Sequence, residues 1–144
     1  MPIITPTDLS THIYAEVINE ITRADSTLVT KAIDTAIQET KMYLSRYDLV
    51  QLFGTDTVAP TITDEHLKSL VKDITCWHLI RLANVNVHYD VFKNAYRDAI
   101  KTLKAIMKGS ASPDGWPYKD TTDENLPEGS AISWQSERKR ENYF

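Results

Sequence analysis

The most regular part of the sequence lies at residues 63–83 and reads TDEHLKSLVKDITCWHLIRLA. Its first three residues predict a helix start, because Thr and Asp cap free backbone N–H groups and acids suit the positive end of the helix dipole. Apolar side chains then recur at helical spacing, and residues 76–83 are apolar on nearly every side. A helix of that kind is usually buried between others. We therefore expect this helix at the centre of an all-α fold, with Leu70 and Trp77 nearly fully buried.

Three further helices are predicted around this central one. Residues 8–21 carry an apolar side chain every four positions, and residues 26–47 carry a wide apolar arc that can contact two neighbours at once. Residues 88–108 form the last helix, and Gly109 follows at the position of a C-terminal cap. Residues 48–62 have no helical period and are expected to form a loop whose apolar start packs down. The sequence thus predicts a small four-helix bundle with a long central helix.

The composition changes at Ser110. Residues 110–144 are rich in Pro, Gly, acids and hydroxyl side chains, and cannot build a core of their own. We therefore divide the chain into a helical domain, residues 1–109, and an extended polar and aromatic C-terminal tail, residues 110–144. The tail nevertheless keeps large aromatic side chains that need another surface to cover them, namely Trp116, Tyr118, Trp134, Tyr143 and Phe144.

Composition also limits the compartment and the kind of ligand. The chain has 144 residues, of which 42% are hydrophobic, and a formal net charge of −4, which argues against a globally basic nucleic-acid binder. Its one cysteine permits no intrachain disulfide and indicates a reducing compartment. No apolar run approaches the roughly 20 residues of a membrane helix, and the first residues lack the pattern of a signal peptide. We expect no membrane association.

Catalytic and metal sites are not predicted. Cys76 and His78 are two residues apart on one helix, so their side chains point about 200° apart and cannot share a metal or a proton. A buried apolar setting also raises the pKa of a thiol. The sequence contains no phosphate-binding glycine loop and no Gly-x-Ser-x-Gly motif. We expect a protein that is not an enzyme and has no cofactor.

A basic stripe is the first feature that indicates a binding surface. Its five members lie within roughly an 80° arc of the last predicted helix: Lys93, Arg97, Lys101, Lys104 and Lys108. One interpretation is a solvated helix face whose long side chains cover the edge of the core. The other is an electrostatic contact, and the acidic chain favours a neighbouring subunit over nucleic-acid phosphate. The candidate acids on that neighbour are Glu16, Glu20, Asp34 and Glu39.

The end of the chain is the second such feature. Residues 134–144 combine aromatic with basic side chains, the types that dominate interface hot spots. A solvated tail is the simpler interpretation, but the aromatic ends favour a segment that orders on a partner. The candidate contact residues are Trp134, Arg138, Lys139, Arg140, Tyr143 and Phe144.

The order of these features resembles the phage head–tail connector (head-completion, adaptor) proteins, and among them the Mu-like prophage gp36 family. The resemblance covers roughly residues 9–109. It is carried by IDTA at 33–36 leading to YLSRY at 43–47, by LKSLVKDITCWHL at 67–79, and by YRDAIKTL at 96–103. In that family an arginine–tyrosine pair ends the long helix.

The resemblance implies a virion structural protein that forms a ring, commonly dodecameric, at the head–tail junction. Its partners would be the portal protein and a tail or stopper protein, and DNA would pass through the ring without sequence-specific binding. The protein would be present in the host cytoplasm during assembly. The alternative function is a small soluble nucleic-acid-binding or regulatory helical protein that uses the basic stripe.

Overall fold

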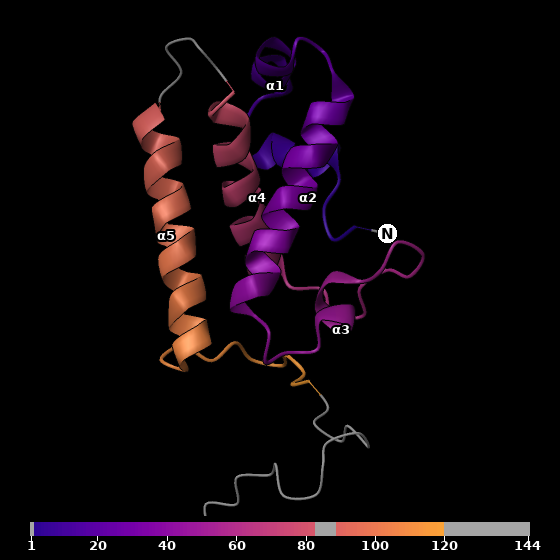
Figure 1. The fold of residues 1–144 in the computed structure, drawn as a ribbon, viewed down its shortest axis with the longest axis vertical. Coiled ribbons are helices and arrows are strands. Elements are labelled where there is room, and N and C mark those ends of the chain that lie inside the picture. Colours follow the sequence, from indigo (N-terminus) through magenta and orange to yellow (C-terminus); the bar gives the residue numbers. More distant parts are fainter. Residues whose placement is uncertain (1, 83–88, 120–144) are drawn as a thin grey trace, which may run out of the picture.

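The computed structural model describes residues 2–82 and 89–119. Within them the fold is all-α, as the sequence predicts, and no strand is present. The helical segments are η1 (Pro6–Thr11), α1 (Ala15–Thr22), α2 (Ser26–Tyr43), α3 (Leu49–Phe53), α4 (Glu65–Ile80) and α5 (Tyr89–Lys108). η1 is a short 3-10 helix. In Figure 1, α2, α4 and α5 run side by side along the long axis, and η1 and α1 lie toward one end.

Helix α4 is the central element. It packs against α2, α5, α1 and η1, which confirms the position expected for it. Leu70 is buried as predicted, and the Oδ1 of Asp64 accepts a hydrogen bond from the N–H of Leu67 and caps the helix. Trp77 was expected to be nearly fully buried, and that prediction is wrong. Its ring is only half-buried because it lies between α4 and α5, stacked on Tyr96 at 5.5 Å and against Tyr89 at 5.1 Å between ring centroids.

The first predicted helix is divided into two. Residues 8–21 do not form one helix: η1 begins at Pro6, and the chain turns between Thr11 and Ala15 before α1. The chain turns here because Ile13 and Ile18 are both buried in the core. They are five positions apart, so they would lie about 140° apart on one straight helix, and the turn lets both face the core.

The second predicted helix ends earlier than expected, at Tyr43. Leu44 and Tyr47 are almost fully buried in the turn that follows. The expected loop at 48–62 contains the one-turn helix α3, which Asp48 caps by accepting from the N–H groups of Val50 and Gln51. Leu52 and Phe53 belong to the core and Leu49 packs against it, as predicted for the apolar start of the loop, whereas Val50 is exposed.

Candidate functional site

The basic stripe lies along α5. The opposite face of this helix holds it to the body through the buried side chains Ala99, Leu103 and Ile106. Four stripe residues are exposed and Lys93 is half-buried, with its Nζ 5.9 Å from the centre of the Tyr89 ring. Among the described residues, no stripe cation has a carboxylate within 4.0 Å. The stripe is therefore a row of positive charge without acidic partners in the described part of its own chain.

A groove of about 470 Å³ runs beside the stripe. Half-buried Tyr96, Ile100 and Ala105 give it an apolar part, and four stripe cations and Ser110 complete the lining. The stripe and this groove form one surface that offers positive charge next to apolar area.

The C-terminal end of α5 is fixed to the turn after α2. The guanidinium of Arg46 donates to the carbonyl of Met107 at 2.5 Å, so a cation neutralises the negative end of the helix dipole. Gly109 ends the helix with a positive φ of 82°, as the sequence predicts. Arg46 and Tyr47, the pair that carries the family resemblance, lie just beyond the long helix and join it to α5 and to the tail.

Glu39 links three helices. Its carboxylate on α2 accepts from the Tyr96 hydroxyl of α5 at 2.6 Å and from Nε2 of His78 on α4 at 2.9 Å. Burial, followed by the hydrogen bond to Glu39, raises the pKa of Tyr96 to about 12. Glu39 is thus occupied within the chain, whereas the exposed Glu16, Glu20 and Asp34 on α1 and α2 form no ion pair with a described residue. Glu39 stays one of the four candidate acids for a neighbour's stripe, and within the described chain its carboxylate already accepts two hydrogen bonds.

Cys76 is buried, and this burial, with the nearby Asp73 carboxylate, raises the pKa of its thiol to about 12. Asp73 has a raised pKa as well, through its own burial. His12 contacts Ser69 at 3.1 Å and Asp73 at 3.5 Å, whereas His78 contacts Glu39. The described residues include no group of three or more His, Cys, Asp or Glu side chains that could hold a metal ion.

The start of the tail packs on the helical body. Trp116 is buried, and its indole Nε1 donates to Oδ2 of Asp64. Tyr118 stacks on Tyr47 at 5.1 Å between ring centroids, and their backbones form an antiparallel bridge. The sequence indicates that these aromatic side chains need a surface, but it could not identify Asp64 as the partner of Trp116 or Tyr47 as the partner of Tyr118. The predicted contact residues Trp134, Arg138, Lys139, Arg140, Tyr143 and Phe144 lie outside the described residues.

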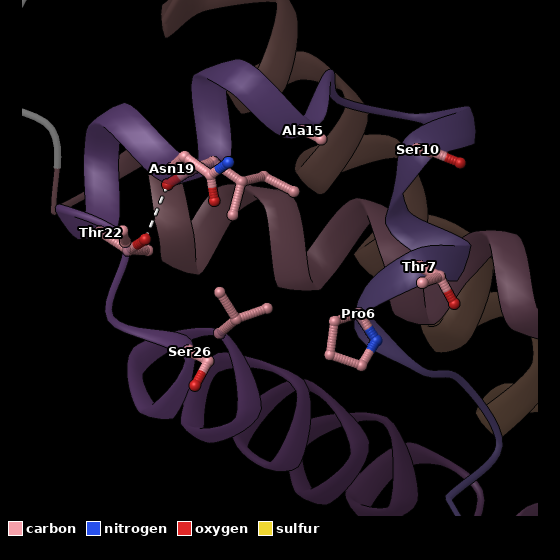
Figure 2. Close-up of a pocket in the computed structure, with 10 residues that line it drawn as sticks. Pro6, Thr7, Ser10, Ala15, Asn19, Thr22 and Ser26 are labelled. Carbon is pink, nitrogen blue, oxygen red and sulfur yellow. Dashed lines mark hydrogen bonds between the residues drawn. The ribbon is translucent and has the colours of Figure 1, made fainter.

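An apolar pocket of about 450 Å³ lies between η1, α1 and the start of α2. In Figure 2, Pro6 and Thr7 of η1 lie on one side of this pocket, and Asn19 and Thr22 of α1 lie on the other. The Thr22 hydroxyl donates to the carbonyl of Ile18. The lining includes no carboxylate, imidazole or thiol, so it offers apolar area and a few hydroxyls rather than acid–base groups.

Comparison with protein families identifies the chain. The family model described as "Bacteriophage Mu, Gp36" matches residues 4–130, which is most of the sequence. The chain belongs to this Mu-like phage family. Comparison with curated proteins gave no match, and comparison with solved structures gave none. No helix within residues 2–82 and 89–119 is long and apolar enough to cross a membrane.

Proposed function

We propose that this Gp36-family chain is a structural, non-enzymatic subunit of the phage particle. In this proposal it is a head–tail connector that forms a ring between the portal and the tail, with DNA passing through the ring. Membership of a phage family supports the biological setting. The resemblance to connector proteins supports the place in the particle.

The observation that carries the proposal is the basic stripe of α5 and its lack of acidic partners in the described chain. A ring is built from head-to-tail contacts, in which two different faces of the subunit meet. The stripe supplies one charged face. Exposed acids on α1 and α2 supply charge of opposite sign, and complementary charge fixes register and speeds association. These acids are Glu16, Glu20 and Asp34.

Charge reversal tests this pairing. Lys101→Glu with Lys104→Glu should weaken co-assembly of the chain with the portal protein of the same phage, measured by sedimentation, and more strongly at low salt than at high salt. Lys101→Arg with Lys104→Arg keeps the charge and serves as the matched control. Adding Glu16→Lys and Glu20→Lys to the reversed stripe should restore assembly, if these acids are its partners.

The end of the chain is tested separately. Deleting residues 134–144 should leave the circular dichroism spectrum of the helical body unchanged and prevent incorporation into particles, because Trp134, Tyr143 and Phe144 would supply apolar contacts to the portal or to a neighbouring subunit. Normal assembly of the truncated chain would contradict this role. The competing function, nucleic-acid binding through the stripe, predicts DNA affinity that falls steeply with salt.

A further inference from the structure

The groove beside the stripe has the chemistry of a site for an acidic peptide. Exposed Lys101, Lys104 and Lys108 surround the half-buried side chains of Ile100 and Ala105. Lysine is a flexible cation that pairs with carboxylates without strict geometry. An apolar residue between two acids would therefore match both parts of the lining.

The described chain ends close to this groove. The backbone N–H of Lys119 donates to the carbonyl of Arg46 at 2.9 Å, and the guanidinium of the same arginine donates to Met107 in the last turn of α5. Arg46 thus contacts the end of the described chain through its backbone carbonyl and the last turn of α5 through its side chain. Figure 1 shows this segment crossing the base of the molecule below α2.

The next residues of the sequence are acidic. Residues 120–128, here called the acidic segment, read DTTDENLPE and contain four carboxylates and no Lys or Arg. Leu126 and Pro127 stand between Glu124 and Glu128. The segment therefore has the pattern that the groove fits, with apolar side chains flanked by negative charge.

The length of the acidic segment and its local concentration both favour the segment of the same chain, rather than that of a second chain, as the occupant of the groove. An extended chain spans about 3.3–3.6 Å per residue, so the nine positions of the segment reach about 30 Å. The part of α5 from Arg97 to Lys108 is about 17 Å long at 1.5 Å per residue. A segment tethered to its site also has an effective concentration on the order of millimolar, which exceeds that of a second chain in dilute solution.

We propose that in the free chain the acidic segment docks in the groove of its own α5 and screens the basic stripe. This goes beyond the connector role, since it concerns the chain before it meets any partner. The docked segment occupies the charges that a neighbouring subunit would use, so free chains do not associate through the stripe until a partner displaces the segment.

The test uses the full chain in solution without portal protein. Asp123→Asn, Glu124→Gln and Glu128→Gln together neutralise three of the four carboxylates of the acidic segment. In ¹H–¹⁵N spectra we expect the amide signals of Ile100, Lys101 and Ala105 to shift relative to the native chain. Binding of a fluorescein-labelled polyglutamate peptide, measured by polarisation at low salt, should tighten about tenfold because its tethered competitor is lost.

The matched control is Glu16→Gln, Glu20→Gln and Asp34→Asn, which changes the net charge by the same amount on α1 and α2. It should leave the α5 signals in place and alter peptide binding much less. Equal peptide binding by the two variants, or unshifted α5 signals in the first, would overturn the proposal. Signals that move with chain concentration in the native protein would also overturn it, because they would show docking between copies. None of these results bears on the connector role, which the co-assembly experiment with the portal protein tests separately.

Discussion

The indole Nε1 of Trp116 donates a hydrogen bond of 2.6 Å to Oδ2 of Asp64, the residue that caps α4. One carboxylate therefore fixes both the start of the central helix and the beginning of the C-terminal tail. Through it the segment after α5 becomes part of the helical body. The account predicts that these two parts lose stability together.

Asp64→Ala should destabilise the fold by more than the loss of a helix cap alone would. Loss of a cap costs about 0.5–2 kcal/mol, and an indole left without its partner adds about 1–3 kcal/mol. Trp116→Phe, which loses the indole hydrogen bond and part of the buried ring but keeps the Asp64 cap, is the comparison. Urea unfolding measures both. Equal stability of Asp64→Ala and the native chain would contradict this shared role.

The same carboxylate gives a pH dependence. Burial acts to raise the pKa of Asp64, but hydrogen bonds from the Leu67 N–H and the Trp116 indole outweigh it, so the pKa is lowered in the folded state. A lowered folded pKa contributes stability above the unfolded value, about 3.9, and this is lost as the pH falls through the folded pKa. Asp64→Asn should flatten this acid limb of the stability curve, measured by urea unfolding at successive pH values.

Tyr96 makes the stability of the fold depend on pH in the alkaline range. Its pKa is raised to about 12 by burial and by the hydrogen bond to Glu39. Since the unfolded value is about 10, its contribution is fully present below pH 10 and is lost as the pH rises toward 12. Tyr96→Phe should remove that loss, and at neutral pH should cost about 1 kcal/mol for the missing hydrogen bond. An alkaline unfolding curve identical to that of the native chain would refute the prediction.

Cys76 should behave as a core residue. With its thiol buried and its pKa near 12, it should react with a thiol reagent only as fast as the native structure opens. Cys76→Ser buries a hydroxyl and should cost about 1–3 kcal/mol, whereas Cys76→Ala keeps the site apolar and is the control. Rapid stoichiometric labelling of the folded chain would be inconsistent with this environment.

Two glycines of similar φ should differ in their tolerance of alanine. A Cβ at Gly54 would lie 2.5 Å from the Val58 carbonyl oxygen and 2.8 Å from the Pro60 nitrogen, both backbone atoms. At Gly109 the nearest atom is a guanidinium nitrogen of Arg46 at 3.7 Å. Gly109→Ala should therefore cost about 1 kcal/mol for its left-handed φ alone, and Gly54→Ala clearly more. Comparable losses in thermal unfolding would show that the close approach at Gly54 is relieved at no cost.

The long helices could be predicted from the sequence because periodicity and caps agree there. Asp25 caps α2 by accepting from the Thr27 N–H, Asp64 caps α4, and Gly109 ends α5, all as their residue types indicate. Burial in the central helix was predictable for Leu70 by the same reasoning.

The features that were not predicted depend on tertiary contacts, and the periodicity of the sequence does not reveal these. A repeat of four in residues 8–21 suits one helix, but the core takes Ile13 and Ile18, and the chain bends. Trp77 is half-buried because its cover is the rings of Tyr89 and Tyr96 rather than a closed core. The contacts of Glu39 with His78 and Tyr96 were not predictable for a similar reason, since these partners lie on two helices that are distant in the sequence.

Electron microscopy of the purified chain bound to the portal protein of the same phage tests the connector role most directly. The account predicts a ring of this chain seated on the portal, with Lys101 and Lys104 of each subunit facing acidic side chains of the next. A chain that binds no portal, or a ring in which the α5 stripe faces only solvent, would contradict it.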